Sequence, residues 1–521
     1  MVVSSQSFER PTIDIGDGLI MRWSSKADTD NVINLVGDAF RWIPYGDPLP
    51  ENMVPPPNEY FMAGARRMLS GKNAAMSGHD YALVEDTKRA KGRNPIVACA
   101  ALHKHPAYYG SINLQFGKPE LIACDPEYRG KGLIRRLLFE MIHPASDARG
   151  DDLQFIGGIP YFYRQFGYEY ALYVCPGTRF ENADAVPALA KGETEPYNLR
   201  RATVDDIPLL IRLSHPEKRH AIAQVGLHYT PEYWQYTVHD IYEDKQHRFD
   251  ADRDTRIIVD VKTGMDVGFT VVSHGYLGPQ LEAMALEEDL VKYIDAKDSV
   301  LRQLFQHARE RQEIAAREYE LYKKKIGLVT EDDTNGPKPI RFSFGLQLNK
   351  EHPLSILVSD KIKDAPNNIC DYLLYARIPS YKRFIQKITP ELEKRLADSV
   401  IAGISGRLRL NFFRRVEGQD CKGLQIFLEK GKIVDVQNWA PLSDAQLLEE
   451  RLQWKAQGTK APTIYVASFG PLTFSSLITG KNSVEELVLA NGENLIKDNP
   501  TRTLLETLFP KVDHHIDSYI W

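Results

Sequence analysis

Apolar and polar positions alternate along this chain in blocks whose spacing predicts a repeated order of strands and helices. Short apolar runs rich in branched and aromatic residues predict strands, and apolar residues three or four positions apart predict amphipathic helices. The elements expected in the first part of the chain are strands at 18–23, 81–84, 96–102, 121–124 and 153–156 and helices at 29–40 and 59–69. This mixture of hairpins and helical connections indicates an α+β fold.

The same pattern of strand, acidic cap and helix starts again at 197–208, and a third unit starts near Ile378. The later elements expected are strands at 267–272, 281–286, 408–412 and 424–428, a long charged helix at about 300–325 and amphipathic helix over 380–396. We therefore expect three units, at residues 18–185, 196–376 and 377–521.

Composition is that of a soluble globular protein. Of the 521 residues, 43% are hydrophobic and 26% are charged. The net charge of −5 and the lack of Lys/Arg runs with interleaved aromatics argue against a nucleic-acid binder. No apolar segment is long enough to span a bilayer. The five cysteines are odd in number and widely spaced, which indicates reduced thiols, a cytoplasmic location and no zinc-binding pattern.

The segment from Leu121 to Leu138 carries the clearest chemical signal. Its apolar strand ends at Asp125-Pro126, and the turn Arg129-Gly130-Lys131-Gly132 leads into a leucine-rich helix without a polar capping side chain. Backbone N–H groups at such a turn point toward one spot, where they bind phosphate oxygens. We expect a pyrophosphate cradle here. The structural alternative is a plain glycine turn between a strand and a helix.

Two other glycine-rich phosphate loops do not fit this segment. The Walker loop requires Gly-Lys-Ser/Thr, which is missing, and the dinucleotide fingerprint requires three spaced glycines where only two occur. In the second unit, Leu286 is followed by Glu287-Glu288-Asp289 instead of glycines. Because three carboxylates would repel a pyrophosphate, we expect the second unit to lack cofactor binding.

A second motif, Tyr163-x-x-Phe166-Gly167-Tyr168, follows the strand at 153–156. Gly167 suits a left-handed helix end, and a further strand is expected to begin at Tyr168. Most of the aromatic residues in this motif are explained by packing of a helix on the sheet. Tyr163 is the one residue of this motif that we regard as a candidate for a chemical role.

The segment Arg129–Ile134 resembles motif A of the GNAT superfamily of acyl-CoA N-acyltransferases, with Ile134 where glycine or alanine is usual. The Tyr163 motif resembles the end of a later GNAT helix. Together with Ile378-Pro379 at the start of the third unit, these motifs resemble the enhanced-intracellular-survival family of acetyltransferases over residues 20–521. The resemblance implies an active GNAT domain, a second GNAT-like domain without the CoA loop and a sterol-carrier-protein-like C-terminal domain.

The resemblance also implies specific residues for the reaction. Acetyl-CoA would be the co-substrate, Tyr163 the general acid and the carboxylate of Trp521 the base. His514 and His515 are competing candidates for the base, because histidine titrates near neutrality, although we expect them at the surface. The residues implied to bind acetyl-CoA are Ile122, Ala123, Cys124, Arg129, Gly130, Lys131, Gly132, Leu133 and Ile134. Those implied to line the acceptor pocket are Asp38, Phe40 and Trp42.

The acceptors of that family are amines that range from aminoglycosides to lysine side chains, so the resemblance predicts an N-acetyltransferase whose acceptor stays open. It also suggests a homo-oligomer. No metal is expected, because His103 and His105 share a strand face without a third ligand. The alternative is a non-catalytic protein that senses CoA or carries an apolar ligand in its C-terminal domain. We favour an enzyme, because a carrier has no use for a proton donor such as Tyr163.

Overall fold

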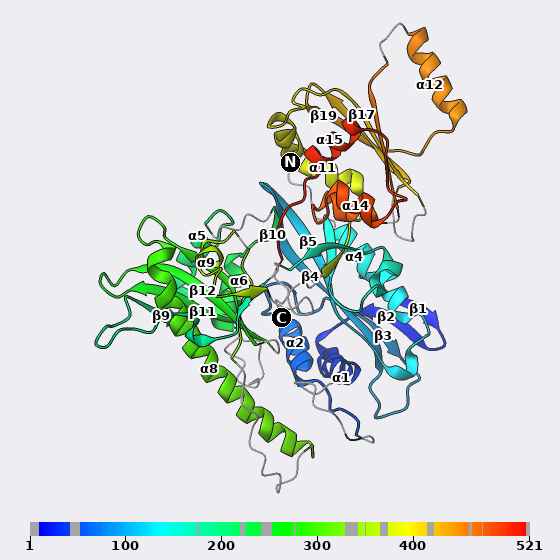
Figure 1. Cartoon of the computed structure of the whole chain (residues 1–521). Helices are drawn as coiled ribbons and strands as arrows, with labels where there is room; N and C mark the ends of the chain where they lie inside the picture. Colours follow the sequence, from blue (N-terminus) through cyan, green and yellow to red (C-terminus); the bar gives the residue numbers. More distant parts are fainter. Residues whose placement is uncertain are drawn as a thin grey trace.

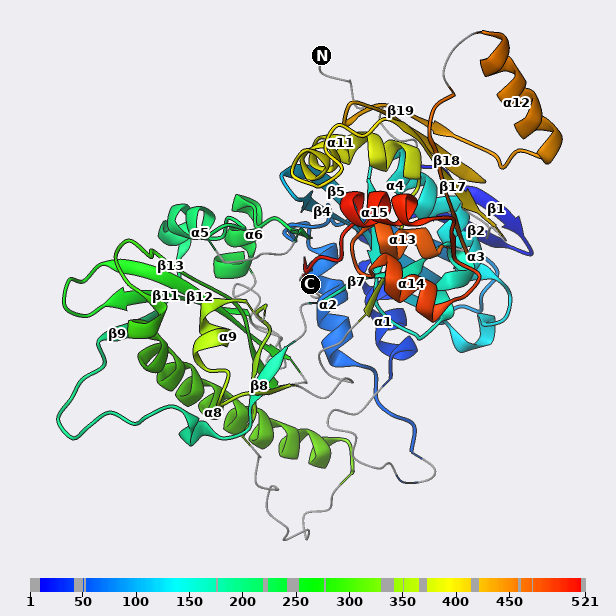
Figure 2. The same cartoon turned by 45° about the horizontal axis from the view of Figure 1, so that its top comes forward.

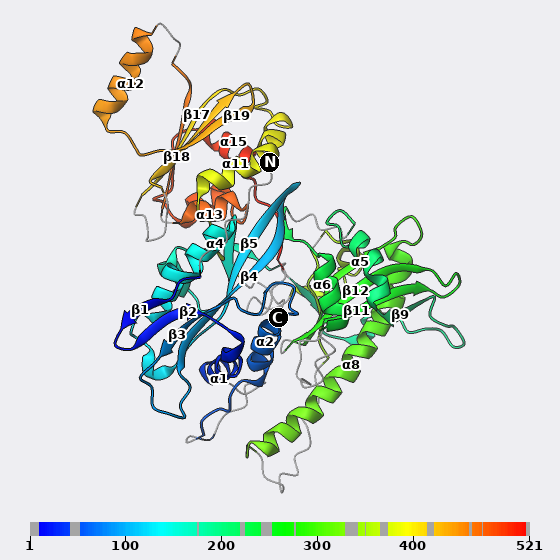
Figure 3. The ribbon, with the colours of Figure 1, turned by 180° about the vertical axis from the view of Figure 1, so that it is seen from behind.

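The chain folds around three β-sheets of ten, seven and five strands, seen from opposite sides in Figures 1 and 3. The computed structural model describes residues 10–41, 50, 53–174, 177–218, 224–240, 253–275, 278–328, 342–349, 351–364, 373–413, 421–457, 461–470 and 472–516.

The first sheet runs in the order β1-β2-β3-β4-β5-β6-β16-β7, and β10 and β22 extend it beside β4. Its strands are β1 (Ile13–Gly16), β2 (Leu19–Trp23), β3 (Tyr81–Asp86), β4 (Ile96–Tyr109), β5 (Ile112–Cys124), β6 (Leu153–Ile156), β7 (Glu169–Tyr173), β10 (Val225–Leu227), β16 (Leu373–Arg377) and β22 (His514–His515). Neighbours from β1 to β5 are antiparallel, whereas β5 and β6 run parallel.

Helices cover both faces of the first sheet. The helices α1 (Thr29–Ala39) and α2 (Glu59–Leu69) pack on one face, and α3 (Leu133–Arg136), the π-helical segment η4 (Leu137–Ile142) and α4 (His143–Arg149) follow one another on the other. On α1, the buried apolar residues recur at helical spacing and form one stripe toward the sheet.

The second sheet runs in the order β15-β8-β14-β13-β12-β11-β9. Its elements are β8 (Thr178–Phe180), β9 (Tyr197–Arg201), β11 (Arg253–Asp260), β12 (Asp266–Gly275), β13 (Gly278–Leu286), β14 (Phe344–Leu346) and β15 (Lys363–Asp364), with α5 (Ile207–Leu213), α6 (Pro231–Gln235), α8 (Tyr293–Lys325) and α9 (Pro353–Leu357). The first half of α8 packs on this sheet, and its charged second half extends beyond it (Figure 1).

The third sheet runs in the order β19-β18-β17-β20-β21. Its elements are β17 (Gly406–Phe412), β18 (Gly423–Glu429), β19 (Lys432–Asn438), β20 (Ile464–Phe469) and β21 (Leu495–Ile496), with α11 (Tyr381–Ala397), α12 (Asp444–Ala456), α13 (Thr473–Ile478), α14 (Val484–Ala490) and α15 (Asn499–Leu508). Figure 2 shows α12 standing away from the sheet, and this helix buries none of its residues. One continuous hydrophobic cluster joins the third sheet and α11 to the first sheet.

The strands do not follow the expected boundaries at 185 and 376. Strand β8, which we expected in the first unit, pairs with β14 and β15 of the second sheet. Strand β16, expected in the second unit, lies between β6 and β7 of the first sheet. The units as such stay predictions, but their chain segments are exchanged between sheets. Strand pairing between distant segments leaves no local pattern from which this exchange could be deduced.

Several expected elements are correct in kind but differ in extent. The helix over 59–69 is confirmed, and the helices expected over 380–396 form the single helix α11 despite its internal Pro390. The long helix α8 begins at Tyr293, earlier than expected. The element before Gly167 is the short 3-10 helix η5 (Phe162–Phe166). Within the described residues, none of the helices combines the length and the apolar character that crossing a membrane requires.

The exchange predicts that the first unit cannot fold from its own segment. A fragment of residues 10–185 would lack β16, so β6 and β7 would lose their shared neighbour together with the core that they share with α11. We expect this fragment to show no cooperative thermal unfolding by circular dichroism, in contrast to the full chain. A cooperative transition with native near-ultraviolet signal in the fragment would contradict the exchange.

Candidate active site

The chain bends sharply between β5 and α3. Gly130 and Gly132 have left-handed φ values of 76° and 73°, and a Cβ atom added to either glycine would meet nothing within 4 Å. Gly132 is the N-cap of α3 and supplies no capping side chain. The first hydrogen bond across this turn runs from Arg136 N to Gly132 O. The preceding amides at 133–135 therefore have no acceptor inside the helix.

Side chains from the β3–β4 loop hold this bend in place. Arg89 forms an ion pair of 2.5 Å with Asp125, and its guanidinium lies 5.1 Å from the centre of the Tyr128 ring. The Lys131 ammonium lies 4.4 Å from the same ring, and the Tyr128 hydroxyl donates to Asp86. The sequence did not reveal Arg89, because it lies between the expected strands at 81–84 and 96–102, where no local pattern singles it out.

The bend is electropositive. Arg129 and Lys131 are exposed on either side of Gly130, and their full charges add to the partial positive charge of the helix start. Burial alone would raise the pKa of Asp125, but the hydrogen bonds from Arg89 and from the Glu127 amide hold that pKa below its usual value. The Asp125 carboxylate is thus engaged away from the bend, which leaves the glycine side suited to an anion.

The last residues of β5 present a free edge beside the bend. Asp125 N–H donates to Val97 O of β4 at 2.9 Å, and backbone groups alternate along a strand, so those of Ile122 and Cys124 face the opposite edge. On that side, the described residues of β5 pair with β6 only at Phe116 and Gly117. Beyond Gly117 the two strands part, while β6 continues beside β16 on its other edge.

The two cysteines near this edge are not prepared as nucleophiles. Burial raises the pKa of Cys99 to about 12. Burial also raises the pKa of Cys124, although the charge of Arg129 opposes this shift. Both side chains are therefore thiols at neutral pH, whereas the reactive form of cysteine is the thiolate.

Tyr163 lies on η5, under the loop that follows β6. Its side chain is 7% exposed, and its ring lies 5.5 Å from that of Tyr375. A Cβ atom on Gly158 would stand 3.8 Å from the Tyr163 hydroxyl oxygen, so this hydroxyl lies beside the backbone just past the end of β6. Gly167 ends η5 in the left-handed conformation that the sequence predicts.

Tyr375 is a neighbour of Tyr163 that the sequence did not reveal. It comes from β16, its ring stacks on Tyr170 at 4.0 Å, and its hydroxyl oxygen lies 2.8 Å from the Tyr170 hydroxyl and 3.1 Å from Ile159 O. Burial and the hydrogen bond with Tyr170 raise its pKa, so it stays protonated. No local signal places a residue from the end of the second unit beside Tyr163.

The expected acceptor residues lie at the end of α1. The Asp38 carboxylate forms an ion pair with Arg41, and the half-buried Phe40 ring packs 4.7 Å from that of Phe61. The negative charge of Asp38 is therefore compensated by Arg41 in this arrangement. Trp42 lies outside the described residues, as does Trp521.

His514 and His515 are buried, so their expected surface location is wrong. They form β22, which pairs with β10 and so draws the chain into the first sheet. His514 Nδ1 accepts from Tyr173 N–H at 3.3 Å, which leaves Nε2 to donate to Thr479 O at 2.9 Å. Burial lowers the pKa of His514 to about 4. With both ring nitrogens engaged, His514 is not suited to be a general base.

The histidines on β4 are also structural. His103 and His105 are fully buried, and burial together with the charge of Lys118 lowers the pKa of both well below the usual value. His103 Nε2 lies 3.3 Å from the sulfur of Met68. These imidazoles are therefore neutral side chains packed inside the protein.

In the described residues of the second sheet, the turn after β13 does not form an equivalent bend. After β13, the residues Glu287-Glu288-Asp289 lead to α8, whose N-cap is Lys292. Arg212 forms an ion pair with Glu287 at this point. Carboxylates thus occupy the place that the glycine amides occupy in the first sheet.

Comparison with known proteins agrees with this geometry. Residues 21–171 match the family model described as an acetyltransferase (GNAT) domain. Comparison with curated protein sequences gives no significant match.

Solved structures match nearly the whole chain at low identity. A GCN5-related N-acetyltransferase from Kribbella flavida is 14% identical, and the match covers 96% of this chain and 98% of that chain at a TM-score of 0.54. A probable N-acyltransferase from Enterococcus faecalis is 14% identical, with 95% and 97% covered and a TM-score of 0.57. A GCN5-related N-acetyltransferase from Anabaena variabilis is 12% identical, with 95% and 99% covered and a TM-score of 0.57. Identities this low show a shared fold.

The family match covers the strands from β2 to β6 and the bend. Residues 21–171 are therefore similar to an acetyltransferase (GNAT) domain in sequence, and the solved structures agree in fold. The resemblance to the enhanced-intracellular-survival family, the sterol-carrier-like third unit, the cytoplasmic location and the homo-oligomer stay predictions.

The anchoring of the bend by Arg89 leads to a stability prediction. Replacing Arg89, which is 6% exposed, by Met leaves the Asp125 carboxylate without its cation, and we expect the free energy of unfolding to fall by about 1–3 kcal/mol at neutral pH. The folded pKa of Asp125 lies below its unfolded value, so this contribution is complete above the unfolded pKa and is lost as the pH falls through the folded one. Urea unfolding from about pH 7 to about pH 3 should show the difference between wild type and variant narrowing below about pH 4.

Arg93 provides the matched control, because its ion pair with Glu127 lies in the same loop but is half-exposed on both sides. Arg93→Met should change stability little. If the free energy of unfolding fell equally in Arg89→Met and Arg93→Met, the role of Arg89 would be contradicted. The same would follow if the difference between wild type and Arg89→Met widened toward low pH.

Proposed function

We propose that this chain is an acetyl-CoA-dependent N-acetyltransferase in which a primary amine attacks the thioester directly. The observation that carries the proposal is the bend at 129–134, where open amides and two cationic side chains meet at an uncapped helix start. This arrangement supports binding of the pyrophosphate of CoA. The residues that would hold it are Arg129, Gly130, Lys131, Gly132, Leu133 and Ile134.

The free edge of β5 supports the placement of the pantetheine arm. The backbone groups of Ile122 and Cys124 would pair with its amides, in the way that an extended peptide adds a strand to an open sheet edge. Ala123, between them, faces β4. Because edge and bend are consecutive in the chain, one extended ligand reaches both.

Tyr163 is proposed to donate its phenolic proton to the sulfur that leaves. The nitrogen of the amine forms the new bond to the acetyl carbon, the carbon–sulfur bond breaks, and the sulfur takes the proton of Tyr163. A base must remove one proton from the amine, and we assign this step to the carboxylate of Trp521. Direct attack is favoured over an acylated cysteine, because Cys99 and Cys124 are protonated thiols at neutral pH.

The acceptor is proposed to enter beside the end of α1, near Asp38, Phe40 and Trp42. Its identity is the most informative unknown, so a thiol-release assay with acetyl-CoA should include polyamines, lysine peptides and aminoglycosides. Release of CoA with any of these amines supports the enzyme. Binding of CoA without release across the panel would favour the alternative, a protein that senses CoA or carries an apolar ligand.

The bend itself can be tested by calorimetry. Gly132→Asp places a carboxylate in the open space of the bend, and we expect it to abolish measurable CoA binding, because the new charge repels the pyrophosphate. Gly150→Asp is the matched control: Gly150 ends α4 with a φ of 83° and also has nothing within 4 Å of an added Cβ atom. The control carries the same backbone strain but should keep its affinity. Retained affinity in Gly132→Asp would refute this placement.

The role of Tyr163 can be tested by single-turnover kinetics. Tyr163→Phe removes only the hydroxyl, and we expect the acetyl-transfer rate to fall roughly 100- to 10,000-fold while CoA binding is kept. Tyr161→Phe is the control, since Tyr161 lies two residues away and is 68% exposed. An unchanged rate in Tyr163→Phe would remove this residue from the chemistry.

A further inference from the structure

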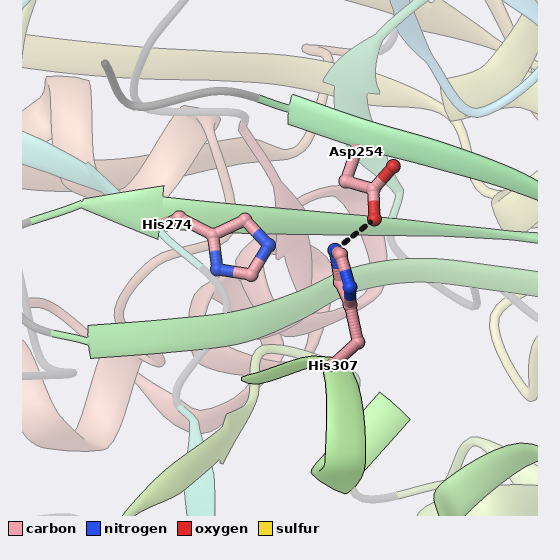
Figure 4. Close-up of side chains that lie close together, drawn as sticks. All are labelled: Asp254, His274 and His307. Carbon is pink, nitrogen blue, oxygen red and sulfur yellow. Dashed lines mark ion pairs between the residues drawn. The ribbon is translucent and has the colours of Figure 1, made fainter. Parts of the chain in front are cut away.

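A cluster of three metal-ligand side chains lies within the second sheet, away from the bend. Asp254 comes from β11, His274 from β12 and His307 from the middle of α8, and Figure 4 shows their side chains converging. One ligand atom from each residue lies within 4.8 Å of the other two. The cluster thus joins two neighbouring strands to the helix that covers them.

The cluster contains a polar atom that the described residues do not satisfy. His307 Nε2 lies 2.9 Å from Asp254 Oδ2, and the His274 and His307 rings lie 5.7 Å apart at an angle of 79°. His274 Nε2 is buried and has no hydrogen-bond partner among the described residues. In Figure 4 the His274 ring points toward His307. A buried ring nitrogen of this kind requires a partner, and none of the described side chains supplies it.

The protonation states at this point favour coordination. Burial lowers the pKa of His274 to about 3, so its imidazole is neutral and offers a lone pair. Burial would raise the pKa of Asp254, but its hydrogen bonds with His307 and Arg256 outweigh burial and hold that pKa below the usual value. The carboxylate is therefore ionised, as a metal ligand must be.

We propose that Asp254, His274 and His307 bind a divalent transition-metal ion, with Zn²⁺ as the best match. Two imidazoles and one carboxylate are the borderline ligands that Zn²⁺ takes, and three protein ligands leave a fourth position for water. The ion would satisfy His274 Nε2 and replace the hydrogen bond between His307 and Asp254. The proposal concerns the second sheet only and does not rest on the proposed acetyl transfer.

Two arginines oppose a cation at this site. Arg256 Nε lies 2.6 Å from Asp254 Oδ2, and Arg256 Nη2 lies 3.1 Å from His307 Nε2. Arg311, one turn beyond His307 on α8, also acts on His274 through its charge. The charges of the two arginines reduce the affinity of the site for a metal ion. Because Arg256 contacts Asp254 Oδ2, the other carboxylate oxygen, Oδ1, is the one that remains for the ion. The site therefore predicts an unusual response: neutralising Arg256 should tighten metal binding.

The consequence of binding would be mechanical. His307 lies where α8 changes from a helix packed on the sheet to one that extends beyond it, since the buried stripe ends at Ala308 apart from Tyr319. An ion shared by β11, β12 and α8 would fix the helix to the sheet at this end of the contact. In the second unit, a metal would thus stabilise a helix whose start has no ligand-binding bend.

The experiment uses the full chain without a histidine tag, freed of metal by a chelator. Titration with Zn²⁺ in a calorimeter should show one bound ion, and Co²⁺ should give the visible absorption bands of a nitrogen- and oxygen-coordinated site. His274→Gln and His307→Gln should each weaken binding by at least the roughly 10- to 100-fold that loss of an outer-shell partner costs. Arg256→Gln should strengthen it.

His239→Gln is the control, because His239 is half-exposed in the same unit and pairs with Asp240 outside the cluster. It should leave the affinity unchanged. All variants are first compared by circular dichroism without metal, so that a folding defect is recognised, and Asp254→Asn provides a third ligand variant. No Zn²⁺ binding by the wild type, or equal binding by wild type and the folded ligand variants, would overturn the proposal and leave an ordered water as the partner of His274.

Discussion

Among the described residues, strand β5 is paired along its whole length on one side but along only two residues on the other, and the proposed ligand edge depends on this asymmetry. β4 accompanies it from Ile112 to Cys124, whereas β6 leaves it after Gly117 and continues beside β16. Backbone N–H and C=O groups inside a protein require partners, so an unpaired edge at this position calls for water or an extended ligand. The edge runs directly into the glycine bend. Edge and bend are therefore one continuous surface of unpaired backbone groups, and the fold creates it by parting two strands.

The insertion of β16 between β6 and β7 joins a late segment of the chain to the first sheet. Strand β16 pairs with β6 on the edge opposite to β5, and it places Tyr375 against Tyr163. The same segment leads into α11, whose apolar side belongs to the hydrophobic cluster shared by the first and third sheets. The surroundings of the proposed proton donor thus depend on residues about two hundred positions further along the chain. A substitution in β16 acts on the site although nothing near Tyr163 in sequence has changed.

The sequence pattern was enough to predict those features that depend on neighbouring residues alone. The helix at 59–69 follows from its apolar stripe, and the left-handed Gly167 follows from the cost of roughly 1–2 kcal/mol that other residues incur in that conformation. Long-range pairing could not be deduced in this way. The exchange of β8 and β16, the burial of His514 and the proximity of Tyr375 to Tyr163 each depend on which distant strand lies alongside. Arg89 was missed for a related reason: its partner Asp125 is 36 residues away.

The turn after β5 and the turn after β13 each lead from a strand into a helix, but the charges at the two helix starts are opposite. In the first sheet, the helix start after β5 is left uncapped, and Arg89 holds the Asp125 carboxylate of the turn in an ion pair. In the second sheet, carboxylates fill the corresponding turn after β13, and Arg212 compensates Glu287. A helix start closed in this way no longer gains stability from a bound anion, so α8 must be held by other contacts. The buried stripe of α8 and its ion pair from His307 to Asp254 supply such contacts within the described residues. In the second sheet, the position of α8 therefore depends on side chains along its length.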